Sequence, residues 1–262
     1  MSDVSSKTEA SNTGERKTAL IPWSPWLAVI FVVATYFLTQ ILALLAVWLW
    51  PAINHWSTAH TEDWLNNSTE AQFFYVLIAE ALTIGALIYF LRLYRSGWRA
   101  IGFRRPKFTD LAWGTFIAPL YYITYILIAI AAGAFLGLDT EQTQQLGFHP
   151  VGGWQLALTF ISLVVLPPLV EETLMRGFLY TSLKKGLPQL SAALTTSVIF
   201  AAAHLQFGSN APLLWVAAVD TFILSLFLIW LREKTGSLWA GMVLHALKNG
   251  VAFASLFIFH LS

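Results

Sequence analysis

The sequence contains no cysteine and very little charge. The absence of cysteine excludes disulfide bonds, thiolate metal sites and a cysteine nucleophile. Charged residues make up 11% of the 262 residues, against about 25% in a typical soluble domain, whereas 57% are hydrophobic. A soluble domain of this length could not bury so much apolar surface, so we expect an integral membrane protein. The 15 Lys and Arg residues balance 14 Asp and Glu residues, which argues against nucleic acid as a partner.

Several familiar patterns are also missing. No internal repeat is evident, which gives little support to an inverted-repeat transporter. There is no Gly-x-Ser-x-Gly, His-Glu-x-x-His or Gly-x-Gly-Asp segment, so serine and conventional zinc mechanisms are disfavoured. Residues 1–20 are polar and lack the apolar core of a signal peptide, so we expect a short disordered cytoplasmic tail.

Apolar segments dominate the rest of the chain. Each is long enough to cross about 30 Å of hydrocarbon as a helix. We therefore predict an all-α, polytopic membrane helix bundle of about seven transmembrane helices, with an eighth, re-entrant piece left open, and a single membrane domain over residues 21–262. The predicted spans are 27–50, 72–91, 111–137, 154–175, 189–207, 212–231 and 237–259.

The distribution of Lys and Arg over the loops predicts the orientation. These residues crowd alternate loops, most densely over 92–107, and are absent from 51–71, 138–153 and 208–211. By the positive-inside rule the N-terminus is cytoplasmic and the C-terminus lies outside. Because no retention or transit signal is visible, we expect the inner membrane of a prokaryote.

Ionisable residues inside a membrane are costly and mark candidate sites. Glu171 and Glu172 follow Pro167 and Pro168, and adjacent helix positions point about 100° apart. Glu172 can pair with Arg176 at i+4, which leaves Glu171 free to face a cavity. The prolines can kink the helix and free backbone carbonyls. The alternative is an ordinary cytoplasmic helix end carrying an ion pair.

Two more spans carry polar pairs at helical spacing. Phe200 lies one turn before His204, and His245 lies one turn before Asn249. A lone intramembrane histidine often only links helices, which is the alternative for His204. Two strong polar groups on one stripe favour function for His245 and Asn249. Gly241, one turn earlier, allows a neighbouring helix to approach.

Asp220 and Lys248 have a different interpretation. Both lie roughly 16–18 Å from the predicted cytoplasmic edge, so we predict a structural ion pair between the last two helices. Glu80 lies in the middle of the second span, and the sequence assigns it no partner.

Three motifs occur in order on these spans, and together they resemble the CPBP family of intramembrane proteases (CAAX protease and bacteriocin-processing, or ABI, family), which includes the type II CAAX prenyl endopeptidase. The resemblance covers about 154–255, which we take as the catalytic core. It implies an endopeptidase that cleaves a peptide or protein substrate at the membrane. The motifs are Glu171-Glu172-x-x-x-Arg176, Phe200-x-x-x-His204 and His245-x-x-x-Asn249.

The resemblance assigns roles to these residues. Glu171 matches the glutamate that activates water, and Glu172 matches the second motif glutamate. We expect His204 to hold the water or the scissile group, and His245 and Asn249 to donate hydrogen bonds to the oxyanion. Arg176 and Phe200 would support the site. Metal dependence stays open: Glu171, His204 and His245 could hold Zn²⁺, but glutamate-activated water needs the same atoms.

One conflict of depth remains in this scheme. Straight helices place Glu171 roughly 5 Å from the cytoplasmic edge and His204 roughly 22 Å from it. The two could meet only if the fourth helix, which we expect to continue to about residue 184, is longer or tilted, or if the fifth begins later.

Two other functions compete with the protease. A catalytically silent scaffold could hold partner helices in the same groove. A proton-coupled transporter could use Glu80, Asp220, Lys248 and the two histidines as a relay. We rank the protease first, the scaffold second and the transporter last.

Overall fold

The computed structural model describes residues 21–139, 147–205 and 213–260, and these residues form helices and connecting loops without a strand. The predicted polytopic helix bundle is thereby confirmed. The predicted tail, residues 1–20, lies outside the described residues.

Six stretches are long and apolar enough to span a bilayer. Helices α1, α3, α10 and α11 match predicted spans closely. The third stretch is divided into α4 and α5, because Pro119 interrupts helical hydrogen bonding there. The six are Pro25–Ile53 (α1), Thr69–Leu93 (α3), Phe108–Leu136 (α4, Phe108–Phe116, and α5, Ala118–Leu136), Gly153–Leu183, Trp215–Thr235 (α10) and Trp239–Ile258 (α11, Trp239–Phe253, with a π-helical end, Ala254–Ile258). A short polar helix, α2 (Thr58–Asn67), lies between α1 and α3.

The fourth stretch is a continuous but irregular helix of 31 residues. Two π-helical turns flank the segment that carries the proline and glutamate pairs. Such turns are rare in proteins, and those that occur often lie at functional sites. The parts are α6 (Gly153–Phe160), a π-turn (Ile161–Val165), α7 (Leu166–Glu172), a second π-turn (Thr173–Leu179) and α8 (Tyr180–Leu183).

The fifth predicted span is the main departure from the sequence-based scheme. In place of a full span over 189–207, α9 covers Gln189–Ala202, and its 14 residues reach only about 21 Å. The fourth helix instead continues to Leu183, as expected from the sequence. Counted from Leu183 and Gln189, Glu171 and His204 lie about 18 Å and about 22 Å deep. The depth conflict disappears because the fourth span does not end at residue 175.

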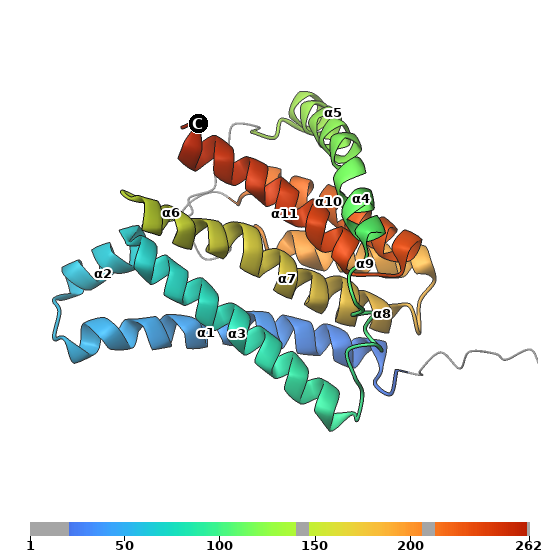
Figure 1. Ribbon diagram of the computed structural model, residues 1–262, viewed down its shortest axis with the longest axis horizontal. Helices are drawn as coiled ribbons and strands as arrows, with labels where there is room; N and C mark the ends of the chain where they lie inside the picture. The colour runs from blue at the N-terminus through green and yellow to red at the C-terminus, as the bar shows by residue number, and fades with distance from the viewer. Residues whose placement is uncertain (1–20, 140–146, 206–212, 261–262) are drawn as a thin grey trace, which may run out of the picture.

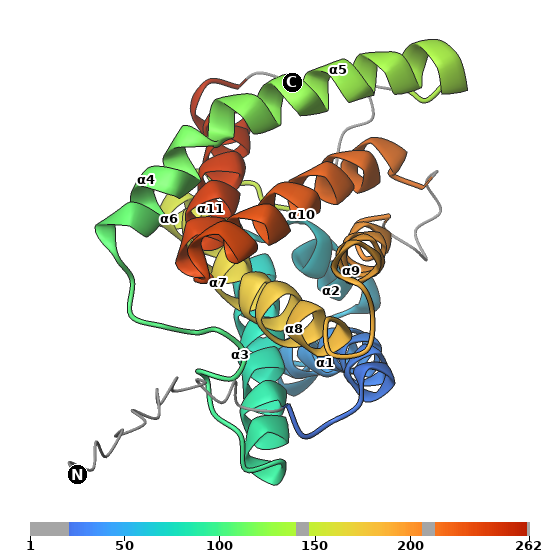
Figure 2. The same ribbon diagram turned by 90° about the vertical axis from the view of Figure 1, so that its right-hand side faces the viewer.

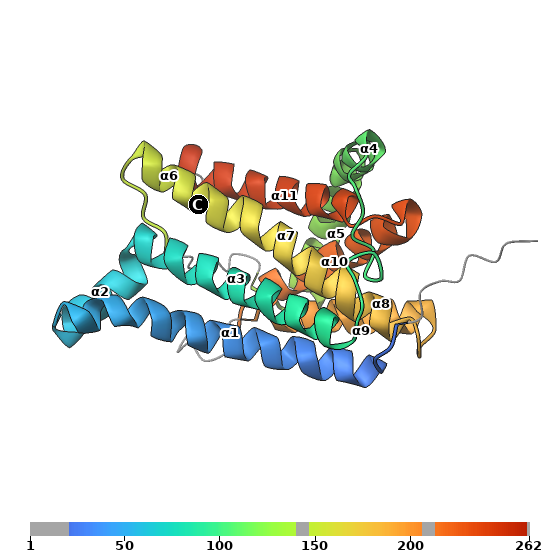
Figure 3. The same cartoon turned by 60° about the horizontal axis from the view of Figure 1, so that its bottom comes forward.

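The long fourth helix lies at the centre of the bundle. Helices α1 and α3 pack together on one side of it, and α9, α10 and α11 pack on the other (Figure 1). Helix α5 crosses the outside of α10 and α11 and is largely exposed (Figure 2). Helices α1, α3, α7 and α11 run roughly side by side (Figure 3). This arrangement surrounds the glutamate pair with the helices that carry the other motifs.

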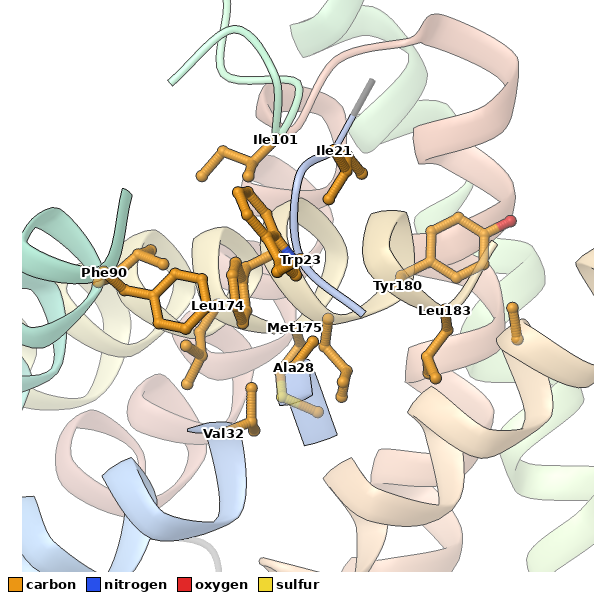
Figure 4. Close-up of a cluster of buried hydrophobic side chains, with 14 of the residues drawn as sticks. Ile21, Trp23, Ala28, Val32, Phe90, Ile101, Leu174, Met175, Tyr180 and Leu183 are labelled. Atoms are coloured by element: carbon orange, nitrogen blue, oxygen red, sulfur yellow. The ribbon is translucent and has the colours of Figure 1, made fainter. Parts of the chain in front are cut away.

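A buried aromatic cluster anchors one end of the central helix. Trp23, only 1% exposed, packs edge-on against Phe90 of α3 and stacks on Phe178 at 5.3 Å between ring centroids. Its indole Nε1 donates to Ser182 Oγ at 2.7 Å. Apolar side chains from α1, α3 and the loop at Ile101 complete the cluster (Figure 4). Burying apolar surface stabilises a fold by about 25 cal/mol per Å². The burial of this cluster therefore holds in place the helix that carries the glutamates.

Candidate active site

The proline pair creates an acceptor that another helix uses. In a helix the carbonyl of Leu163 would accept from residue 167, or from residue 168 in a π-turn, but both are proline and have no N–H. The amide Nδ2 of Asn249 donates to this carbonyl at 2.8 Å. The predicted release of a carbonyl by Pro167 and Pro168 is confirmed, and it ties α11 to the central helix beside the glutamates.

Behind the site, Glu172 is held by two partners. Its Oε1 accepts from Arg176 Nη1 at 2.9 Å, and the Nδ1 of His245 lies 3.1 Å from the same oxygen. The side chains of Glu172 and Arg176 are 1% and 0% exposed. Because Arg176 stabilises Glu172 as a carboxylate, the proton between the carboxylate and the imidazole belongs to His245 Nδ1.

Helix α11 passes close to this carboxylate at Gly241. A Cβ at Gly241 would lie 3.0 Å from Glu172 Oε2. Since Glu172 is held by Arg176 and His245, its carboxylate has little freedom to move away. The expectation that Gly241 permits close helix approach is confirmed, and the approaching group is the second glutamate.

The side chain of Glu171 points away from that of Glu172 and toward a cavity, as the angle of about 100° between adjacent helix positions predicts. Its Oε2 lies 3.8 Å from Nε2 of His245. That oxygen is buried and has no hydrogen-bond partner among the described residues, although the side chain as a whole is 28% exposed. A carboxylate oxygen and a ring nitrogen therefore face each other across a gap too wide for a direct hydrogen bond.

His204 lies just past the end of α9, inside the bundle. Its Nδ1 is 2.8 Å from the carbonyl oxygen of Phe200, and Tyr36 Oη of α1 donates to the neighbouring Ala203 carbonyl at 3.0 Å. The Phe200 ring packs edge-on against His204 at 4.8 Å and lies under the Arg176 guanidinium, whose Cζ is 4.2 Å from the ring centre. Phe200 thus separates the buried ion pair from the histidine and orients both.

These groups converge on one cavity of about 200 Å³. Glu171, His204, His245 and Asn249 all line it, although they come from three separate parts of the chain. Glu172 and Arg176 lie behind it, and Glu80 of α3 is outside its lining. The remaining polar groups of the lining are Thr221 and Lys248.

The sequence reasoning did not place Lys248 at this cavity. Its Nζ lies 3.0 Å from Asp220 Oδ2, the geometry expected of the predicted ion pair, and Tyr121 Oη donates to the other oxygen of Asp220. The signal in the sequence was the spacing: Lys248 is three residues after His245, so the two lie on neighbouring positions of one helix face.

Glu171, His204 and His245 are the candidate ligands for a metal ion. Within the part of the chain that the structure describes, no three His, Asp or Glu side chains are grouped so that they could hold a metal ion. In the described residues, Glu171, His204 and His245 are not grouped as a three-ligand zinc centre.

Comparison with known proteins points to one family. Residues 153–251 match the model of the family described as type II CAAX prenyl endopeptidase Rce1-like. The matched segment contains the glutamate pair, Arg176, His204, His245 and Asn249. No curated protein and no solved structure matches the chain.

Proposed function

Residues 153–251 place the chain among the CAAX-type intramembrane endopeptidases of the CPBP family, and from this premise we propose that it hydrolyses a peptide bond of a membrane-associated substrate with water activated by Glu171. The observation that carries the proposal is the gap between Glu171 Oε2 and His245 Nε2 at the cavity. A separation of 3.8 Å matches the span of a water oxygen that lies about 2.8 Å from each atom. Because Oε2 is buried in this structure, the Glu171 side chain has to turn further toward the cavity to admit that water.

The hydrogen-bond partner of each imidazole indicates which ring nitrogen carries the proton and which has a lone pair. A backbone carbonyl only accepts, so Nδ1 of His204 carries a proton, and the Glu172 carboxylate imposes the same tautomer on His245. In their neutral forms both rings then have a lone pair at Nε2. His245 is thus suited to accept a hydrogen bond from the water, a role that differs from the sequence-based expectation that it donates to the oxyanion.

The reaction follows from these positions. Glu171 removes a proton from the water as its oxygen attacks the carbonyl carbon of the scissile bond, and the carbonyl electrons move to the oxygen. The resulting oxyanion can accept from the second N–H of Asn249, because only one is used by Leu163, and from Lys248. Each such donor contributes about 3–4 kcal/mol. Glu171 then returns its proton to the leaving nitrogen as the C–N bond breaks.

Glu172 and Arg176 act in this scheme as positioning residues. Glu172 orients His245, and Arg176 keeps Glu172 ionised and contacts Phe200. Neither lines the cavity, so neither is assigned contact with the reacting atoms.

Quantitative proteomics of membranes tests the proposal. Cells expressing the wild type, Glu171→Gln or the exposed control Glu62→Gln are compared. We expect uncleaved precursors to accumulate only with Glu171→Gln, and likewise with His204→Ala and His245→Ala. Wild-type processing by a folded Glu171→Gln protein would overturn the mechanism. Unchanged biological activity in that variant would instead favour the scaffold.

A further inference from the structure

A second, larger pocket lies away from the catalytic cavity, where several spans end. Its volume is about 580 Å³. It is formed by the residues before α1, the loop after α3 and the ends of α8 and α10. Its walls include Ile21, Arg99, Tyr180 and Arg232. The Tyr180 ring, only 1% exposed, lies at the edge of the aromatic cluster (Figure 4).

The charge of this pocket is strongly unbalanced. Four cationic side chains line it, namely Arg99, Lys184, Lys185 and Arg232, against the single carboxylate of Glu233. Lys184 pairs with Glu233 at 2.8 Å. Four positive charges and one negative charge leave a net charge of +3. In the described part of the chain, neither Arg99 nor Arg232 has a carboxylate oxygen within 4.0 Å.

The guanidinium of Arg232 packs against the backbone at Gly102. Gly102 adopts a φ of +83°, and a Cβ there would lie only 1.8 Å from Arg232 Nη2. The Nε of Arg232 is buried and has no hydrogen-bond partner among the described residues. Nε therefore lies behind the pocket wall, whereas the guanidinium as a whole brings a positive charge to that wall, where it can meet an external anion.

The position of the pocket indicates the source of that acceptor. It lies beside the start of the span Pro25–Ile53 and the ends of Gly153–Leu183 and Trp215–Thr235, so it is at the level of the lipid headgroups. Basic pockets between spanning helices on the cytoplasmic side bind anionic headgroups. We propose that this pocket binds the phosphate of an anionic phospholipid, with Arg99 and Arg232 as its main ligands. The proposal does not depend on the proposed proteolysis.

Native mass spectrometry of the purified full-length protein tests the proposal. Detergent-solubilised protein is titrated with phosphatidylglycerol or with phosphatidylcholine, which shares the phosphate but has no net charge. We expect the wild type to bind phosphatidylglycerol at least tenfold more tightly. The double variant Arg99→Gln/Arg232→Gln should lose this preference. The matched control Arg92→Gln/Arg105→Gln, which removes two exposed charges from the same basic region outside the pocket, should retain it.

Other outcomes are also decisive. Equal binding of the two lipids by the wild type, or equal loss in the control variant, would overturn the proposal. Binding of glycerol 1-phosphate as tight as that of the lipid would assign the pocket to a soluble phosphate and overturn the membrane source. If Arg232→Gln lowers the folded yield, Arg99→Gln alone serves, because Arg99 is exposed and its loss should still weaken binding several-fold.

Discussion

Nε2 of His245 lies 3.8 Å from Oε2 of Glu171, the two atoms facing each other without a hydrogen bond between them. A direct hydrogen bond would need about 2.7–3.2 Å. Because Nδ1 of the same ring is held by Glu172, His245 cannot turn to close the gap without losing a buried charge-assisted contact. The wider separation is therefore built into the packing of α7 against α11, and it is the feature on which the proposed chemistry depends.

Asn249 has two proposed roles, a structural hydrogen bond to Leu163 and a hydrogen bond to the oxyanion, and a double variant can separate them. Asn249→Ala leaves the Leu163 carbonyl without a donor, which should cost about 1–3 kcal/mol of stability, and removes an oxyanion donor. Adding Pro167→Ala restores a backbone N–H for that carbonyl. We expect the double variant to regain thermal stability but not cleavage. Recovery of full activity would show that Asn249 has only a structural role.

Breaking the buried ion pair should destabilise the fold. Removing Arg176 leaves Glu172 as an uncompensated charge, which should cost about 3–5 kcal/mol. We expect Arg176→Met to reduce the folded yield strongly, and Glu172→Gln/Arg176→Met to recover much of it while remaining inactive, since His245 has lost its carboxylate partner. Folded yield and thermal unfolding in detergent measure the effect. A single variant as stable as the wild type would contradict this prediction.

Two glycines of α11 provide a matched comparison. Gly241→Ala places a methyl group 3.0 Å from Glu172 Oε2, whereas Gly250→Ala meets only Val164 Cγ1 at 3.7 Å, an ordinary contact. Displacement of Glu172 would reorient His245, so we expect Gly241→Ala to lower kcat at least tenfold. Gly250→Ala should stay within about twofold of wild type. Equal effects of the two substitutions would show that Glu172 does not position the histidine.

The pair of Asp220 and Lys248 predicts a charge-swap rescue. Either single reversal, Asp220→Lys or Lys248→Asp, places like charges 3.0 Å apart inside the bundle and should reduce expression. The double reversal restores attraction, so we expect expression to recover. Activity need not recover with it, because Lys248 also lines the cavity. Absence of any recovery in expression would refute the structural role of the pair.

The absence of native cysteine makes the predicted orientation directly testable. Ala59→Cys lies on α2 and Arg105→Cys in the basic loop, at opposite ends of the bundle (Figure 3). In intact cells we expect a membrane-impermeant maleimide to label Ala59→Cys and to label Arg105→Cys only after permeabilisation. The reverse pattern would invert the orientation and place the basic pocket outside the cytoplasm.

Much of the site was predictable because its signals are local. The i and i+4 spacing of Glu172 and Arg176 determines their pairing within one helix, and the proline pair determines which carbonyl lacks a donor. The length of α9 was not predictable in the same way. Residues 203–207 are apolar enough to continue a span except for His204 and Gln206, and hydropathy does not say where a buried helix stops.

The amino-acid sequence alone determined membrane embedding, the helical class, the order of the polar motifs and the separate directions of Glu171 and Glu172, since these follow from composition and helical period. Tertiary structure alone decided that Glu171 and His204 reach similar depths, that Lys248 lines the cavity, and that Nδ1 of His245 meets the carboxylate of Glu172. Those properties depend on where helices end and cross, and on which acceptor a distant segment brings to the nitrogen of His245.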